Sequence, residues 1–424
     1  MTNDILNNKP KISKNIIIKQ KENKVLLIDC EGVSYVTVSK SMANLLLTLN
    51  GTKTIQEIIN ELNESKDEMM SQRIIAAFEK LYKLDIFQDN CKEIIEQEKI
   101  LKKVYFNLTK RCNLKCHYCG VDADINNSIE ERSLEFWERQ VLDLKEINKK
   151  ATVYFTGGEP VLYKYFWQLA EFIKKNNISL YLISNGTILK NEDIENLRKY
   201  FTGIKISIDS LNEDINSLTR GIGSLEKSKK FVDALIEKGI KPTIKVVVTQ
   251  KNKNHLQEMQ DYFGNKADID FQYIGKVGRA KQHDELFLTV DEFYNALQKI
   301  NKKRGNFINI TRRLKKVWCD MGRQVLSIEC NGLVYPCQTL HNKKFILGDL
   351  NKQILKEIYR DSLSKKINIE SIDGCSSCEI KFFCGAGCRS RAFYTTGNIL
   401  SKDPLCAGFL KKKYIEIMFG SSNT

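Results

Sequence analysis

The 424-residue sequence has little of what marks a membrane, secreted or fibrous protein. Its apolar runs fall short of the roughly 20 residues that a membrane-spanning helix needs, so we expect no membrane span. Five prolines and 23 glycines exclude collagen-like and Pro/Gly-rich low-complexity architectures. The segment Met1 to Lys14 is polar and has no apolar signal-peptide core. We therefore expect a cytoplasmic protein, in a reducing compartment where disulfides are rare.

Cysteine, by contrast, is plentiful, because the chain holds 13 and most of them are clustered. Only Cys30 and Cys91 fall in the first hundred residues, and residues 120–318 contain none. The remaining cysteines form two groups, Cys112, Cys116 and Cys119 in one, and Cys319, Cys330, Cys337, Cys375, Cys378, Cys384, Cys388 and Cys406 in the other. Clustered thiols in a chain without disulfides indicate bound metal.

The net charge of +15 is spread unevenly along the chain. Residues 1–100 hold 14 basic and 15 acidic side chains, so the whole surplus lies in residues 101–424. Binding to nucleic acid draws mainly on Lys and Arg, which the first hundred residues do not have in excess. We expect no nucleic-acid partner.

Residues 1–98 are expected to form a small α+β domain followed by a linker. The apolar segments 25–28 and 35–38 flank Glu31-Gly32-Val33, which predicts a β-hairpin. Helices are expected over 41–49, from a Thr54 cap to Leu62, and over 73–84. A hairpin with three short helices is the inventory of a winged-helix domain.

Residues 99–310 alternate between strand and helix patterns. The expected strands are 104–108, 153–155, 180–183, 204–208, 244–248 and 269–273, and the expected helices between them are 130–147, 165–173, 192–200, 225–238 and 255–263. Such repeats predict an α/β fold with a parallel sheet, here a partial (β/α)6 barrel. Residues 311–424 would form a small Cys-rich domain. In such sheets the chemistry gathers at the carboxyl ends of the strands.

The decisive motif, Cys112-x3-Cys116-x2-Cys119, directly follows the first of these strands. Three thiolates on one loop can hold three corners of a cubane iron–sulfur cluster and leave one iron open. The alternative is a zinc knuckle or three unconnected thiols. Structural zinc takes four ligands, usually at two-residue spacing, so the x3 gap and the missing fourth ligand favour iron.

This motif resembles that of the radical S-adenosylmethionine enzymes, and the likeness spans about residues 101–280. The resemblance implies a [4Fe-4S] cluster whose open iron binds S-adenosylmethionine and whose electron releases a 5′-deoxyadenosyl radical. Tyr118 matches an aromatic position near the adenine. Gly157-Gly158-Glu159 matches a motif that contacts the methionine amino group, which suits a carboxylate acceptor. Alone, Gly-Gly-Glu-Pro is a common turn.

Weaker signals at two further strand ends match cofactor contacts of the same family. Ser184-Asn185 follows the third strand, and Ser207 and Asp209 can both point into the barrel because they alternate with Ile208. Their alternative role is turn formation and helix capping. Arg220 resembles a family arginine near the cofactor carboxylate, and its alternative role is a solvated loop charge.

The C-terminal cysteines resemble the seven-cysteine SPASM extension of radical enzymes that modify peptides, over about residues 311–412. The resemblance implies two auxiliary [4Fe-4S] clusters, for three clusters in total. The first would be held by Cys375, Cys378, Cys384 and Cys406, and the second by Cys319, Cys337 and Cys388. Cys330 is suggested as the fourth ligand of the second cluster, and the alternative is a buried free thiol. A pair of zinc ribbons fits the x5 and x3 spacings poorly.

Next to such an enzyme, the first domain resembles the peptide-recognition element related to the peptide chaperone of pyrroloquinoline quinone biosynthesis. The likeness rests on element order and on the turn Leu49-Asn50-Gly51-Thr52. It implies that a leader peptide adds a strand to the sheet, beside residues 35–38 and 73–84. The alternative is a dimerisation or scaffold domain. Cys30 and Cys91 belong to no ligand set.

The resemblances together imply a maturase of a ribosomally made precursor peptide. It would take a hydrogen atom from a core-peptide carbon and close a Cys thioether, as sactipeptide and ranthipeptide synthases do. The implied partners are the precursor peptide and an external electron donor such as flavodoxin or ferredoxin. Alternatives are a carbon–carbon crosslinker, a sulfatase-type maturase, or a zinc-containing protein that binds nucleic acid. No side chain stands out as a catalytic acid or base.

Overall fold

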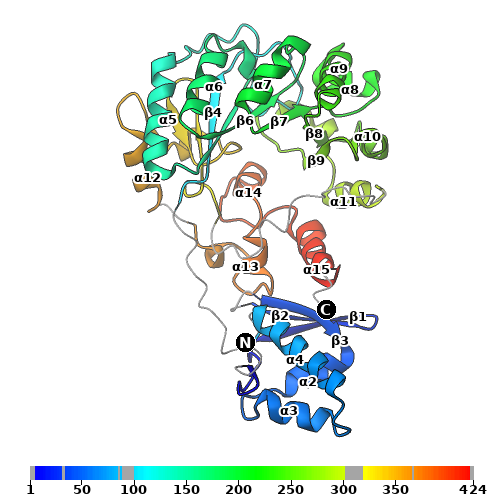
Figure 1. Ribbon diagram of the computed structural model, residues 1–424. Helices are drawn as coiled ribbons and strands as arrows, with labels where there is room; N and C mark the ends of the chain where they lie inside the picture. Colours follow the sequence, from blue (N-terminus) through cyan, green and yellow to red (C-terminus); the bar gives the residue numbers. More distant parts are fainter. Residues whose placement is uncertain are drawn as a thin grey trace.

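The computed structural model describes residues 5–30, 34–84, 86–87, 100–300, 319–364 and 367–420. Two sheets organise this part of the chain, a large one of nine strands and a small one of three. Figure 1 shows them at opposite ends of the molecule, with the C-terminal helices α13 (Lys381–Cys384), α14 (Arg389–Thr396) and α15 (Lys411–Gly420) between them. None of the helices in the described ranges is long and apolar enough to cross a membrane.

The large sheet contains the six expected parallel strands in sequence order. They are β4 Lys103–Thr109, β5 Thr152–Gly157, β6 Ser179–Ser184, β7 Gly203–Ser207, β8 Thr243–Val248 and β9 Asp268–Tyr273. Each pairs in parallel with the next. In the described part of the chain no ladder joins the two ends of the sheet, so the barrel stays open.

Helices cover the outer face of this sheet, and Figure 1 shows α5, α6 and α7 side by side over it. Their bounds are α5 Leu134–Asn148, α6 Phe166–Lys175, α7 Ile194–Tyr200, α8 Glu213–Arg220, α9 Ser224–Glu237, α10 Leu256–Phe263 and α11 Val290–Gln298. The expected helices are confirmed with shifted ends. For example, α5 begins at Leu134 because the Ser133 side chain accepts a hydrogen bond from the Phe136 backbone N–H.

The alternation of β4 separates the core from the inner face of the sheet. Phe106 is fully buried and packs on Trp137 of α5, with ring centroids 4.7 Å apart. Tyr105 faces the other way and stacks on Tyr154, which stacks on Tyr181, at centroid distances of 4.9 and 5.0 Å. A row of tyrosine rings therefore lines the inner face across three strands.

The C-terminal segment adds three short strands to the same sheet. They are β10 Val325–Ile328, β11 Leu333–Tyr335 and β12 Gly348–Asp349, and helix α12 is Leu355–Ser362. Strand β10 pairs in parallel with β4, and Ser327 lies opposite Tyr105. The cysteine-rich segment is thus joined to the barrel through backbone hydrogen bonds, which the sequence patterns do not predict.

The N-terminal part contains the expected hairpin and three helices, and one additional strand. Its elements are β1 Ile16–Lys21, β2 Lys24–Asp29, β3 Ser34–Ser39, α2 Lys40–Thr48, α3 Ile55–Leu62 and α4 Glu68–Lys83. The predicted Thr54 cap is confirmed, as a capping box with Glu57. Helix α4 starts earlier than expected because Asp67 caps it. The turn at residues 31–33, Cys91 and most of the linker lie outside the described residues.

Both faces of the small sheet are covered. Leu27 and Val36 belong to a separate small core with α2, α3 and α4, whereas Leu26 and Ile28 join the main core of the molecule. Helix α15 packs on β2 and β3 from that second side, as Figure 1 shows. The N-terminal domain is therefore docked on the cysteine-rich segment through an apolar interface.

Candidate active site and cysteine clusters

The first cysteine group lies on the loop after β4 and lines a pocket at the carboxyl ends of the barrel strands. Cys112, Cys116 and Cys119 share this pocket with most of the residues predicted to contact the cofactor, namely Tyr118, Gly157, Gly158, Ser184, Asn185, Ser207 and Arg220. The two other predicted residues, Glu159 and Asp209, lie behind the pocket wall and hold residues that line it. The structure thus brings together residues from five separate segments.

The glycine pair packs against the base of the cysteine loop. A Cβ on Gly157 would lie 2.4 Å from the Thr109 carbonyl oxygen, and one on Gly158 would lie 2.1 Å from that of Arg111. Gly157 also has a φ of +125°, which L side chains rarely adopt. The glycines therefore let β5 lie directly on the backbone that leads into Cys112.

Glu159 follows the second barrel strand, β5, and its buried carboxylate reaches the end of the third strand, β6. Its carboxylate accepts hydrogen bonds from the Ser184 hydroxyl at 2.7 Å and from the Asn185 backbone N–H at 2.8 Å. Burial raises the pKa of Glu159 to about 7, against the lowering effect of these two donors. Because burial disfavours the charged form of this carboxylate, a cation beside it would stabilise that form.

Asp209 organises the opposite wall of the pocket. It accepts hydrogen bonds from the hydroxyl of Tyr118, from the hydroxyl of Thr219 at 3.0 Å and from the backbone N–H of Val247 at 3.0 Å. The Arg220 guanidinium donates to the Tyr118 hydroxyl at 2.6 Å. Arg220 is 7% exposed, so it is a buried part of the site and not a solvated loop charge.

Sequence reasoning missed several residues of this pocket. Lys245 and Val247 line it from β8, and Arg279 lines it from the 3-10 helix η4 (Gly278–Gln282) after β9. Burial lowers the pKa of Lys245, whose amine lies 3.9 Å from the Asp270 carboxylate. A lysine inside an apolar strand and a glycine before Arg279 were the only signals available.

The donor set fits an iron–sulfur cluster. Burial raises the pKa of the Cys112 thiol to about 12 and also raises that of Cys116. Such thiols need a bound metal to become thiolates at neutral pH. Among the described residues, no three His, Cys, Asp or Glu side chains converge tightly enough for a single metal ion. A cubane joins each thiolate to a different iron, so it needs no such convergence.

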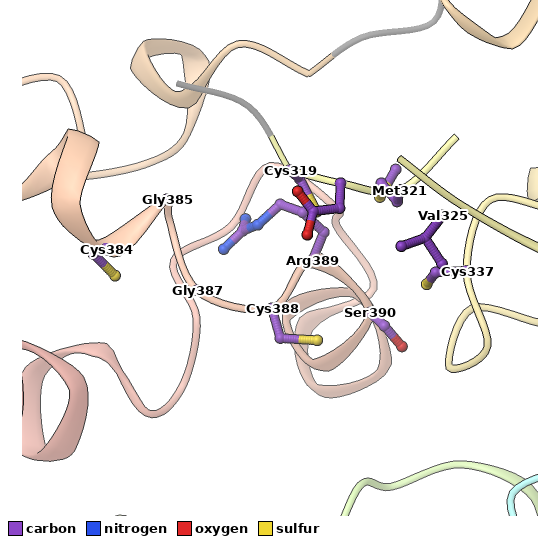
Figure 2. Close-up of a pocket in the computed structure, with 11 residues that line it drawn as sticks. Cys319, Met321, Val325, Cys337, Cys384, Gly385, Gly387, Cys388, Arg389 and Ser390 are labelled. Carbon is purple, nitrogen blue, oxygen red and sulfur yellow. The ribbon is translucent and has the colours of Figure 1, made fainter. Parts of the chain in front are cut away.

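A second pocket lies in the C-terminal segment. Cys319, Cys337 and Cys388 come from three separate stretches of chain around it, and Figure 2 shows Cys384 at its far side. Burial raises the pKa of the Cys337 thiol to about 12, and the neighbouring Cys388 and Cys319 raise it further. These three predicted ligands are therefore neighbours.

The four cysteines of the other predicted set, Cys375, Cys378, Cys384 and Cys406, also lie near one another. Burial raises the pKa of the Cys375 thiol, and the nearby Cys406 and Cys378 add to this effect. Cys384 behaves alike, with a pKa raised to about 12 by burial and then by Cys406 and Cys378. The grouping of four cysteines matches the set expected from the sequence.

Cys330 lies apart from both groups. It is fully buried, and burial followed by Glu329 raises the pKa of its thiol to about 11. The other charged groups that act on it are Lys110 and Glu131, and it does not line the pocket of Cys337. This placement does not support the prediction that Cys330 is a fourth ligand.

A buried ion pair fixes the loop that carries Cys388. The Arg391 guanidinium donates to the two carboxylate oxygens of Asp403 at 2.8 and 2.7 Å. Asp403 Oδ2 also accepts from the backbone N–H of Cys388 at 2.5 Å. A Cβ on Gly387 would lie 2.3 Å from that same oxygen, so the loop passes directly over the carboxylate.

Comparison with known proteins agrees with these clusters. The profile described as the radical SAM superfamily matches residues 106–263, and that described as an iron-sulfur cluster-binding domain (SPASM) matches residues 319–379. The former implies a 4Fe-4S cluster with S-adenosylmethionine, and the latter implies auxiliary clusters.

Two curated relatives cover most of the chain. The antilisterial bacteriocin subtilosin biosynthesis protein AlbA of Bacillus subtilis is 24% identical over 375 residues, 80% of this chain and 80% of AlbA. An AdoMet-dependent heme synthase of Methanosarcina barkeri is 23% identical over 337 residues, 72% of this chain and 95% of the synthase.

A solved structure matches almost the whole fold. SuiB of Streptococcus suis bound to S-adenosylmethionine superposes with a TM-score of 0.58 at 16% identity, over 94% of this chain and 100% of SuiB. SuiB bound to its precursor peptide SuiA gives a TM-score of 0.57. The two domain matches show that the chain carries a radical SAM domain followed by a SPASM domain, and SuiB shares its fold.

Proposed function

We propose that this protein is a maturase of a ribosomally synthesised precursor peptide and that it closes a Cys thioether in that peptide. The relatives support action on a peptide, since AlbA serves bacteriocin biosynthesis and SuiB binds a precursor peptide. The observation that carries the proposal is an apolar groove beside an edge strand of the N-terminal domain.

The groove runs between β3 and α4. In the sheet order β1-β2-β3, β3 is an edge strand, so a peptide can pair with it. The cavity measures about 370 Å³ and is lined by Val36, Val38, Met42, Arg73, Ala76, Ala77, Lys80, Leu81 and Leu84. An extended leader would place alternate apolar side chains in this groove.

The charges at the groove indicate which leader it favours. Arg73 and Lys80 are the charged residues among its lining, and both are exposed. Between these two basic residues, the small side chains of Ala76 and Ala77 leave space on the same helix. We infer that the leader is an extended segment with apolar anchors and acidic side chains beside α4.

Within the barrel, Cys112, Cys116 and Cys119 would hold the cluster, and the Glu159 carboxylate, buried behind Ser184 and Asn185, would attract the ammonium of S-adenosylmethionine through the pocket wall. Gly157, Gly158, Ser184, Asn185, Ser207 and Arg220 would form the rest of the cofactor wall, with Asp209 fixing Tyr118 near the adenine. The bound cofactors supply a carbon radical that removes a hydrogen atom from the core peptide. The protein places the target C–H bond and excludes water from it.

The two C-terminal cysteine sets would hold one auxiliary cluster each. Cys375, Cys378, Cys384 and Cys406 supply four thiols, whereas Cys319, Cys337 and Cys388 supply three. Auxiliary clusters held by these thiols would supply an electron acceptor for closure of the new bond. An external donor of the flavodoxin or ferredoxin type would supply the electron that starts each turnover.

The test is anaerobic co-expression with each short peptide encoded beside the gene, followed by mass spectrometry. A thioether removes two hydrogens from the peptide and leaves the joined cysteine unable to react with iodoacetamide. A loss of two hydrogens with every cysteine still alkylated would mean a carbon–carbon bond and would contradict the thioether. Unmodified peptides in every case would contradict the maturase proposal.

A matched pair of variants tests the groove. Ala76→Lys puts a long side chain into it, whereas Gln72→Lys places the same residue on an exposed position of α4 outside the lining. We expect the first to weaken binding of the modified peptide's leader at least tenfold and the second to leave it unchanged. Equal affinity of the two variants for the leader would show that the leader does not bind in this groove.

A further inference from the structure

Arg279 lies in η4, shortly after the sixth barrel strand β9, and binds the loop that carries Cys116 and Cys119. Its backbone N–H donates to the Cys119 carbonyl at 3.1 Å. Its side-chain Nε donates to the Cys116 carbonyl at 2.9 Å. Nη1 donates to the Ala123 carbonyl and to the Asp122 carboxylate, both at 2.8 Å. Four contacts thus tie one arginine to residues 116–123.

The backbone before Arg279 is shaped for this approach. Gly278 has a φ of +57°, and a Cβ there would lie 2.2 Å from the Cys119 carbonyl oxygen. A side chain at this position would force the two segments apart. The contact between η4 and the cysteine loop is therefore built into the chain and does not depend on a flexible side chain alone.

One nitrogen of Arg279 is left over. The Arg279 side chain is only 11% exposed. Its Nη2 atom is buried and has no hydrogen-bond partner among the described residues. A buried guanidinium N–H without an acceptor is unfavourable, so a ligand of the filled site is expected to provide one.

The two other cations of this pocket already have partners. Arg220 donates to Tyr118 and lies 3.7 Å from Asp209, and Lys245 lies 3.9 Å from Asp270. Arg279 differs because its bonds go to the backbone of the segment that carries Cys116 and Cys119, and to the largely exposed Asp122. The unused N–H therefore sits beside the cluster end of the pocket.

We propose that Arg279 is a positioning residue that donates an Nη2–H hydrogen bond to a sulfur of the radical SAM cluster and thereby raises its reduction potential. Hydrogen bonds to cluster sulfurs and nearby positive charge favour the reduced, more negative cluster. The other three nitrogen donors hold the loop in place, so one residue fixes the ligands and adjusts the electron affinity of the cluster. This role goes beyond the peptide chemistry proposed above and does not depend on it.

The test is an electron paramagnetic resonance titration of the reconstituted full chain without S-adenosylmethionine. The radical SAM signal is identified as the one that changes when S-adenosylmethionine is added afterwards. We expect Arg279→Gln to shift its midpoint potential to a more negative value and Arg279→Lys, which keeps the charge, to shift it less. Asp122→Asn, which alters only the Nη1 side, should leave the potential unchanged.

Iron content separates this effect from simple loss of the loop. An Arg279→Gln chain with full iron and the wild-type potential would overturn the proposal. So would an unchanged potential with tenfold weaker S-adenosylmethionine binding, since Nη2 would then serve the cofactor carboxylate. Loss of the cluster from both Arg279 variants would also contradict it, because a purely structural role would be sufficient.

Discussion

The ring of Tyr35 packs edge-on against the ring of Phe383, with centroids 5.9 Å apart and planes at 77°. Tyr35 belongs to β3, whose next residue Val36 lines the groove on the opposite face of the strand. Phe383 precedes Cys384 in α13. A single strand therefore contacts the proposed leader site on one face and the cysteine-rich segment on the other.

Removing this contact should loosen the docking of the N-terminal domain. Tyr35→Ala deletes an edge-to-face pair worth about 0.5–1.5 kcal/mol beyond the apolar area it buries. We expect faster hydrogen exchange in α13 and α15 while the small core stays protected. Ile18→Ala on β1, where the side chain is 50% exposed, is the matched control. Identical exchange in both variants would show that the interface does not depend on Tyr35.

Binding of S-adenosylmethionine should depend on pH through Glu159. The pKa of about 7 means that the free protein holds this carboxyl protonated below neutrality, whereas an ammonium partner requires the carboxylate. Affinity should therefore weaken as pH falls below 7, by up to about tenfold per pH unit. Calorimetry from pH 5.5 to 8 measures this, and Glu159→Gln should bind weakly without the pH step. An unchanged profile in that variant would assign the step to another group.

Loss of the Asp403 carboxylate should release the cluster that we propose Cys388 helps to hold. Asp403→Asn leaves the largely buried Arg391 without its charged partner, which costs about 3–5 kcal/mol in buried pairs. We expect about four fewer irons per chain and a lower denaturation midpoint. Asp361→Asn makes the same change beside Arg360 on the surface, where its side chain is 56% exposed, and should alter neither quantity. Full iron in the Asp403 variant would contradict the account.

The Cys330→Ala and Cys337→Ala variants should differ in the amount of iron that each chain binds. Cys337→Ala removes a thiol from the three-cysteine group and should cost about four irons per chain. Cys330→Ala should keep its iron, because Cys330 lies beside Glu329 and Lys110 and away from that group. Iron loss from the Cys330 variant would restore it as a ligand.

The sequence predicts the barrel strands and the cysteine groups because periodicity and motif spacing are local. It does not predict α8, which buries Asn216, Thr219 and Arg220 and exposes Leu218, so its buried face is polar. For the same reason the sequence alone leaves open whether Arg220 contacts the cofactor or is a solvated loop charge.

The other omissions involve contacts between distant parts of the chain. Strand β10 has four residues and pairs with β4, more than two hundred residues earlier. Arg279 reaches Cys116 across 163 residues. No local pattern indicates either contact, since each is decided by packing that exists only after the sheet has formed.

The most direct test of the central claim is the formation of 5′-deoxyadenosine from S-adenosylmethionine under dithionite, measured with iron content. The wild-type chain should hold about twelve irons and cleave the cofactor. The variant with Cys112, Cys116 and Cys119 all replaced by alanine should keep about eight irons and cleave none. Continued cleavage by that variant would contradict the assignment of this site as the source of the radical.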